Sequence, residues 1–205
     1  MKKILFIIVT VIAIQFFATK AYSCPDGPGW FQTIISMQIN GCWYDIELCV
    51  KCPIAPGEIE EFQIFGITKV ATDPPCIQSW TIAEVQNYAI NYVKENFNTY
   101  SLCIGIPPCG TEQYTWSYIV YHKCWQKETL QNGDIHYFVC MTANCSCNEL
   151  WKFCYDVQND RVIPTLDSGP DSNCPEPNWI CPDAEPVDPP SGITTGCFYI
   201  GTPCD

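Results

Sequence analysis

Basic residues are scarce in this 205-residue sequence, which has 10 Lys and Arg but 22 Asp and Glu. The formal net charge is −12, and so acidic a surface repels phosphates and anionic lipid, which excludes nucleic acid as a partner. No apolar run of about 18 residues follows residue 23, so we expect no transmembrane helix there. Collagen and coiled-coil repeats are also missing, while 47% hydrophobic residues argue against disorder.

The first 23 residues have the layout of a secretory signal peptide. Lys2 and Lys3 precede the apolar stretch 4–18, and Ala21-Tyr22-Ser23 is a small-x-small cleavage site. Its removal leaves seven basic and 22 acidic residues, a net charge of −15. Cys24 comes next, so a lipidated bacterial protein is an alternative, although lipidation would leave an odd 15 thiols. We expect a secreted or extracellular protein, with the periplasm or a lipid-anchored cell surface as alternatives.

Cysteine is abundant, with 16 residues after the predicted cleavage site. Behind an export signal, this number predicts up to eight disulfide bonds rather than metal sites or reactive thiols. The disulfide candidates are Cys24, Cys42, Cys49, Cys52, Cys76, Cys103, Cys109, Cys124, Cys140, Cys145, Cys147, Cys154, Cys174, Cys181, Cys197 and Cys204.

Spacing restricts the cysteine pairing only in part. Cys174/Cys181 and Cys197/Cys204 are seven residues apart in proline-rich sequence, where a local bridge is geometrically easy. Cys42/Cys49 and Cys147/Cys154 have the same separation in strand-like sequence. Positions seven apart on a strand lie more than about 20 Å apart and on opposite faces, so these four cysteines need other partners.

The segment 31–52 carries the clearest structural pattern. Hydrophobic residues alternate with polar ones on both sides of Asn40-Gly41, a strong signal for a two-residue hairpin turn. Such a turn places five pairs on the apolar face: Ile39/Cys42, Met37/Tyr44, Ile35/Ile46, Thr33/Leu48 and Phe31/Val50. Turn chemistry and alternation therefore predict the same register, and a slip of one residue would expose the whole face.

A third strand is expected over Phe62–Val70, and one helix follows it. Residues 81–84, Thr-Ile-Ala-Glu, form a capping box. The helix is expected from Ile82 to Phe97, and it should lay an apolar stripe on the sheet: Ile82, Val85, Ala89, Val93 and Phe97. Tyr88 and Tyr92 are expected to extend this core contact.

Two further hairpins are expected. A strand over Thr115–Trp125 leads to a turn at Asn132-Gly133 and a strand over Ile135–Met141, and a two-residue loop pairs Glu128/Tyr137 and Thr129/His136. Within 150–166, a turn at Asn159-Asp160 pairs Val157/Val162, Tyr155/Pro164 and Phe153/Leu166, with Trp151 on the same face. Pro164 cannot donate a ladder hydrogen bond, so its strand is expected at a sheet edge.

Composition changes from Pro164 onward, where nine of the last 42 residues are proline and acids recur: Asp167, Asp171, Glu176, Asp183, Glu185, Asp188 and Asp205. Four cysteines with Trp179, Phe198 and Tyr199 favour an arm stapled by disulfides over a free linker. We therefore expect a signal peptide (1–23), an α+β domain (24–165) and an irregular disulfide-stapled arm (166–205). The domain should hold an antiparallel, hairpin-built sheet with one main helix on a face.

The cysteines and histidines suggest chemistry that the pattern does not support. Cys49-Val-Lys-Cys52 is the only CxxC, but it ends a strand instead of opening a helix, which favours a structural role over thiol–disulfide exchange. Cys49, Cys52, Cys145 and Cys147 are the candidate ligands of a zinc ion. Zinc ligation is also disfavoured, because the C-x-C spacing of Cys145 and Cys147 is not that of a zinc finger. His122 and His136 are the only histidines, and the expected register does not bring them together.

Other catalytic and metal motifs give no site residues. There is no GxSxG and no CxxCH, so neither an esterase-type nucleophile nor a c-type haem is indicated. A carboxylate pair remains an open alternative, although nothing marks two of the 22 acids. The acidic arm could bind calcium, but it lacks the Asp-x-Asp-x-Asp-Gly order. We predict no cofactor, no metal and no catalytic residue.

Trp43 is the one residue that we single out for binding. It follows the first turn and points away from the apolar face, so it is expected to be exposed, as aromatics of binding surfaces are. The sequence thus predicts an exported, non-catalytic, disulfide-rich protein with a structural or binding role at the cell exterior. Its partner would be an extracellular protein or a glycan. The alternatives are a small secreted hydrolase that uses a carboxylate pair and a thiol–disulfide exchange protein.

Overall fold

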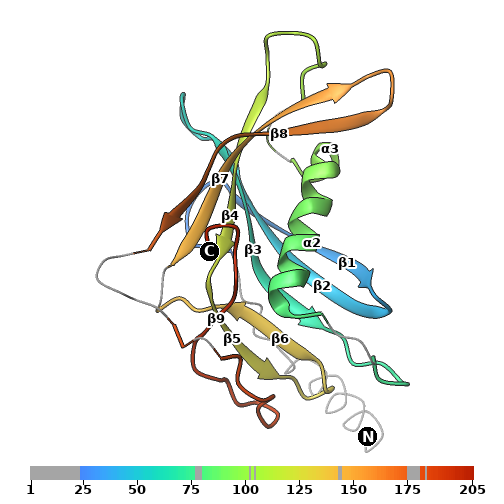
Figure 1. The fold of residues 1–205 in the computed structure, drawn as a ribbon, viewed down its shortest axis with the longest axis vertical. Helices are drawn as coiled ribbons and strands as arrows, with labels where there is room; N and C mark the ends of the chain where they lie inside the picture. Colours follow the sequence, from blue (N-terminus) through green and yellow to red (C-terminus); the bar gives the residue numbers. More distant parts are fainter. Residues whose placement is uncertain are drawn as a thin grey trace, which may run out of the picture.

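The computed structural model describes residues 24–76, 80–101, 103, 105–142, 145–174, 181–182 and 184–205. The expected signal peptide lies outside them. This part folds into a nine-stranded sheet with one main helix (Figure 1). Its elements are β1 (Trp30–Ile39), β2 (Cys42–Lys51), β3 (Glu60–Lys69), α2 (Ile82–Glu95), α3 (Phe97–Tyr100), β4 (Thr115–His122), β5 (Cys124–Thr129), β6 (Ile135–Val139), β7 (Ser146–Asp156), β8 (Arg161–Asn173) and β9 (Phe198–Tyr199). Within these residues, no helix is long and apolar enough to cross a membrane.

The first hairpin has the expected register. Ile39 faces Cys42 and each further pair down to Phe31 and Val50 is as predicted. Asn40 and Gly41 both have positive φ values, 50° and 82°, which the tight two-residue turn requires. Most of the predicted face is buried, but Phe31 at the open end of the hairpin is 48% exposed.

The centre of the sheet is β3, which changes one of its neighbours halfway along. One side pairs with β2, while the other pairs first with β4 over residues 60–63 and then with β6 over residues 66–69. A β-bulge opposite Glu47 and Leu48 separates the two stretches. The sheet therefore divides beside β3 into a branch β4-β7-β8 and a branch β6-β5-β9, and we call this division the fork (Figure 1).

The expectation of a purely antiparallel sheet is wrong, because β3 and β4 run parallel. Parallel strands need a long crossover connection, and here the chain between them holds α2 and α3. The sequence showed the helix and both strands but not their adjacency. The observed fold is a sheet-rich, mixed structure with one main helix and many disulfides.

The helix begins as predicted. Thr81 caps it, since its side chain accepts from the Glu84 N–H while the Glu84 carboxylate accepts from the Thr81 N–H. The predicted stripe is buried, and Phe97, at the start of α3, stacks on Phe153 of β7 with ring centroids 3.8 Å apart. Tyr88 and Tyr92 do not extend the core contact, because their side chains are 43% and 37% exposed to solvent.

The second hairpin has a different register from the predicted one. Its loop contains three residues, Gln131-Asn132-Gly133, closed by a hydrogen bond from the Leu130 N–H to the Asp134 carbonyl. Gly133 has φ +89°, the conformation that such loops place on a glycine. The odd loop length shifts the register by one residue, so the observed pairs are Glu128/His136 and Lys127/Tyr137. The expected strand 115–125 also divides at Lys123 into β4 and β5.

The third hairpin also differs, by two residues. The Asp156 carboxylate accepts hydrogen bonds from two backbone N–H groups of the loop 157–160, which makes the loop four residues long. The observed pairs are Tyr155/Val162 and Phe153/Pro164. A shift of two keeps each side chain on its predicted face. The edge position of Pro164 is confirmed, because β8 is the outer strand of its branch.

All 16 cysteines form disulfides, as expected, with Cα–Cα distances between 4.3 and 5.9 Å. The pairs are Cys24–Cys49, Cys42–Cys76, Cys52–Cys103, Cys109–Cys154, Cys124–Cys181, Cys140–Cys197, Cys145–Cys174 and Cys147–Cys204. The prediction that Cys42, Cys49, Cys147 and Cys154 do not pair with one another is confirmed, because each is bonded to a cysteine in another part of the chain.

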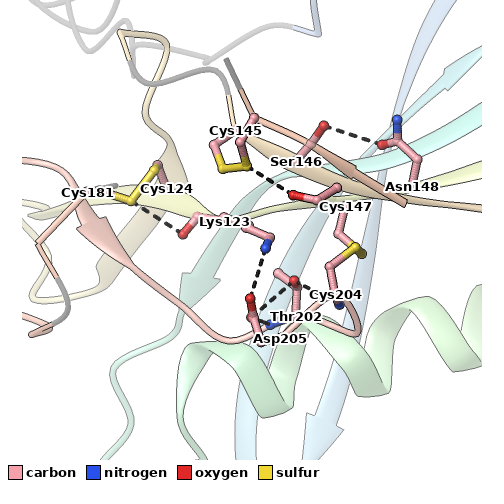
Figure 2. The surroundings of a disulfide bond; sticks show 12 residues. Lys123, Cys124, Cys145, Ser146, Cys147, Asn148, Cys181, Thr202, Cys204 and Asp205 are labelled. Carbon is pink, nitrogen blue, oxygen red and sulfur yellow. Dashed lines mark hydrogen bonds and ion pairs between the residues drawn. A yellow bond between two sulfur atoms is a disulfide. The ribbon is translucent and has the colours of Figure 1, made fainter. Parts of the chain in front are cut away.

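The two local bridges considered for the C-terminal region do not form. Each of its four cysteines is bonded to a cysteine in or beside a strand of the sheet, and Figure 2 shows Cys124–Cys181 and Cys147–Cys204. The reason is tertiary: β8 runs beside β7, and β9 pairs with β5, so each arm cysteine meets a cysteine of the body.

Candidate functional site

A cleft of about 400 Å³ opens at the fork. We call the face of the sheet that is turned away from α2 the outer face. The cleft lies on this face, because its β3 residues Glu61, Gln63 and Phe65 alternate with Phe62, and Phe62 packs on Phe97 on the helix side. Residues from β1, β4, β6, β7 and β8 complete the lining, together with Pro25, Cys140 and Met141 outside the strands. The volume is within the range of small-ligand sites, about 300–1,000 Å³.

The floor of the cleft holds a buried pair of polar side chains. His122 is 7% exposed and Gln63 is 4% exposed, and His122 Nε2 lies 2.6 Å from Gln63 Oε1. Burial lowers the pKa of His122 to about 4, so the ring is neutral at pH 7 and donates its Nε2 proton to the amide oxygen. The Phe65 ring meets the His122 ring edge-on, with centroids 5.9 Å apart. This pair fixes the position of both side chains.

Glu61 is the carboxylate of the cleft. Its Oε1 accepts a hydrogen bond of 3.4 Å from the Gln63 amide, which links it to the buried histidine. Burial raises the pKa of Glu61, and the positive charge of Lys51, its register partner on β2, opposes that rise. Asn148 and Ser146 of β7 lie on the same lining and add further polar groups. The cleft thus offers hydrogen-bond donors and acceptors beside apolar surface.

A second polar cluster lies on the outer face beyond the bulge. His136 Nδ1 is 2.8 Å from the Thr68 hydroxyl and 4.0 Å from the Glu47 carboxylate. Burial lowers the pKa of His136 to about 4 and raises that of Glu47 to about 6. Gly66 makes room for this cluster, because a Cβ there would lie 2.7 Å from Glu47 Oε2.

No family model, no curated protein and no solved structure matches the chain. Any function has therefore to be inferred from the site itself.

Trp43, the binding candidate from the sequence, is 45% exposed. It lies at the turn end of β2, whereas the cleft lies beside the opposite end of that strand, near Lys51. Eight residues of strand separate these positions, about 27 Å. The structure therefore does not bring Trp43 into the cleft, and it remains a separate candidate on the same face.

The cysteines considered for redox or metal chemistry are all in disulfides. Cys49 and Cys52 belong to different bridges, to Cys24 and Cys103, so the CxxC segment joins three parts of the chain. Cys145 and Cys147 are likewise bonded to arm cysteines, which removes the four thiolates that a zinc site would need. Among the residues with described positions, no group of three or more potential metal ligands occurs.

Acids of the arm pair with lysines of the sheet. The Lys127 ammonium, on a side chain only 3% exposed, lies 2.9 Å from Glu185 and 2.7 Å from Asp188. Lys123 and Asp205 form a second pair at 2.8 Å, drawn in Figure 2. Glu185 and Asp188 thus link the arm to β5, and Asp205 links it to the residue between β4 and β5. Glu176 and Asp183, also considered for calcium, lie outside the described residues.

The expected register does not bring His122 and His136 together, and no sequence motif marks Glu61 or Gln63. One signal was present: the alternation of Glu61 and Gln63 with Phe62 and Ile64 predicts that the two polar side chains share a face. No local pattern showed that β4 would lie beside them in parallel. That pairing places His122 next to Gln63 and creates the cleft.

Proposed function

We propose that this chain is an exported, non-catalytic binding protein and that the cleft at the fork is its binding site. One observation carries the proposal: a cavity of ligand size has a fixed polar floor, His122 with Gln63, surrounded by aromatic and amide side chains. Eight disulfides, typical of extracellular proteins, cross-link the chain, and Cys140 of the cleft lining belongs to one of them. Trp43 is proposed as a second contact, for ligands long enough to reach it.

The carboxylates of the cleft favour binding over hydrolysis. Among the residues that the structure describes on its lining, Glu61 is the only acid, whereas glycosidases of the usual kind place two about 5–10 Å apart across the substrate. Glu60, its neighbour in sequence, points to the opposite face and is fully buried. The cleft therefore contains no pair of acids to divide the roles of general acid and nucleophile.

A cleft-filling variant tests the proposal. Asn148→Trp places a large side chain on the lining, while Asn98→Trp makes the same change at an exposed position of α3. Both variants and the parent protein are applied to one array that carries neutral polysaccharides, anionic polysaccharides and peptides. We expect the parent to bind at least one component without altering its mass, and only Asn148→Trp to abolish this binding. Binding that survives Asn148→Trp, or a probe cleaved by the parent, would refute the proposal.

A further inference from the structure

Three exposed aromatic side chains lie at the start of β4, with Tyr114 directly before the strand and Trp116 and Tyr118 within it. Tyr114, Trp116 and Tyr118 occupy alternate positions and are 40%, 37% and 39% exposed. We call these three residues the aromatic strip. Alternate positions on a strand share one face, and Val120 and His122, the next two of this set, line the cleft. The strip therefore lies on the outer face and leads into the cleft.

The neighbouring strands place polar groups beside the strip. Tyr118 is in register with Glu61 of β3 on one side and with Leu150 of β7 on the other. Val120 lies between Gln63 and Asn148 in the same way. From Trp116 to His122 the strand rises about 20 Å, so the strip continues the cleft as one elongated surface, and we call strip and cleft together the groove.

The side chains of this groove suit a ligand with apolar faces and many hydroxyl groups. Exposed aromatic rings can stack on the C–H faces of sugar rings, while carboxylate and amide groups exchange hydrogen bonds with sugar hydroxyls. We propose that the groove binds an uncharged oligosaccharide, with sugar rings on Trp116 and Tyr118 and hydroxyls bonded to Glu61 and Asn148. This proposal rests on the binding function of the cleft proposed above.

Charge favours a neutral glycan over an anionic one. The two lysines beside the groove already face carboxylates: Lys51 is in register with Glu61, and Lys152 forms an ion pair with Asp167 at 3.8 Å. The molecule as a whole is strongly acidic, with a formal net charge of −12. Sulfated or uronic-acid chains would therefore meet a repulsive field, and the positive charge of each of these two lysines is offset by a nearby carboxylate.

Topology favours a glycan over an extended peptide. Peptides that bind to sheets commonly add a strand to an unpaired edge, where backbone hydrogen bonds supply the affinity. β4 offers no continuous unpaired edge, because it pairs with β7 over its whole length and with β3 over residues 117–120. The outer face of β4 therefore offers mainly side chains to a ligand, and aromatic and amide side chains suit a sugar chain.

Affinity electrophoresis tests the inference on the disulfide-intact protein. Native gels contain hydroxyethyl cellulose, xyloglucan, galactomannan or soluble starch as neutral probes, and carboxymethyl cellulose or alginate as anionic ones. We expect retardation by at least one neutral polysaccharide and not by the anionic ones. Tyr118→Ala should weaken it roughly tenfold, whereas Tyr92→Ala, the same change at an equally exposed tyrosine on α2, should leave it unchanged.

Trp116→Ala and Trp116→Phe separate stacking from folding. We expect the alanine variant to lose retardation and the phenylalanine variant to retain most of it, with equal melting temperatures. If no neutral polysaccharide retards the protein, or if neutral and anionic ones do so equally, the glycan inference is wrong. If Asn148→Trp then abolishes the binding of a peptide on the array, the cleft is still a binding site, although not one for a glycan. If Asn148→Trp abolishes the binding of neither a peptide nor a polysaccharide, both proposals are wrong.

Discussion

Glu60 is a buried carboxyl whose ionisation is expected to cost stability. Its side chain is 0% exposed on the helix side of β3, and the Ser101 hydroxyl lies 3.1 Å from each of its oxygens. Burial raises the pKa of Glu60 from 4.5 to about 7, and the hydrogen bond from Ser101 opposes this rise only in part. Replacement by glutamine keeps the shape and an acceptor oxygen but removes the charge.

The sign and size of the effect follow from proton linkage. Between pH 4.5 and about 7 the native state keeps the Glu60 proton, while the unfolded chain releases it. The contribution of Glu60 to the free energy of unfolding is therefore fully present below pH 4.5 and is lost as the pH rises to about 7. The full pKa difference corresponds to about 3 kcal/mol. The free energy of unfolding of Glu60→Gln minus that of the parent should therefore be about 2 kcal/mol larger at pH 8 than at pH 5.

Guanidinium denaturation at pH 5 and pH 8, with disulfides intact, measures this difference. Subtracting the parent curve removes the contributions of His122, His136 and Glu47, which titrate in both proteins. Glu112→Gln, the same change at an exposed position, serves as the control and should show no such pH-dependent gain. If Glu60→Gln shifts stability equally at both pH values, Glu60 is not a desolvated acid and the reasoning fails.

Three further changes test other parts of the structure. Gly66→Ala should destabilise the fold by about 1–3 kcal/mol in denaturation, and a second change, Glu47→Ala, should reduce that loss by removing the clashing carboxylate. Lys127→Met should cost about 1–2 kcal/mol and speed proteolysis within 184–196; an unchanged digestion rate would show that the ion pairs do not hold the arm. Trp43→Ala should weaken capture of long ligands without lowering the melting temperature, whereas equal loss of both would indicate packing.

The parts of the fold that the sequence predicted are those with redundant local signals. In the first hairpin, the Asn40-Gly41 turn and the alternation of apolar residues demand the same register, so either signal alone was sufficient. In the helix, the Thr81 capping box and the apolar stripe agree in the same way. The two other hairpins lacked this agreement, and their loops of three and four residues shifted the register.

The cleft was not predictable, because it depends on which strands become neighbours. Glu61 and Gln63 were visible as polar residues of one strand face, and His122 as a residue of another strand. Their contact follows from the parallel pairing of β3 with β4, and the fork forms where β6 takes over as the neighbour of β3. These are long-range pairings, and a single sequence carries no local signal for them.

The amino-acid sequence by itself determined the acidic character, the cross-linking of all the cysteines, the first hairpin and the helix. Each of these depends on composition or on contacts between residues close in the chain. The tertiary structure decided which cysteines pair, which strands are adjacent and where the polar side chains meet. Those outcomes depend on packing between residues tens of positions apart, where the burial of the whole core, rather than any local preference, selects one arrangement.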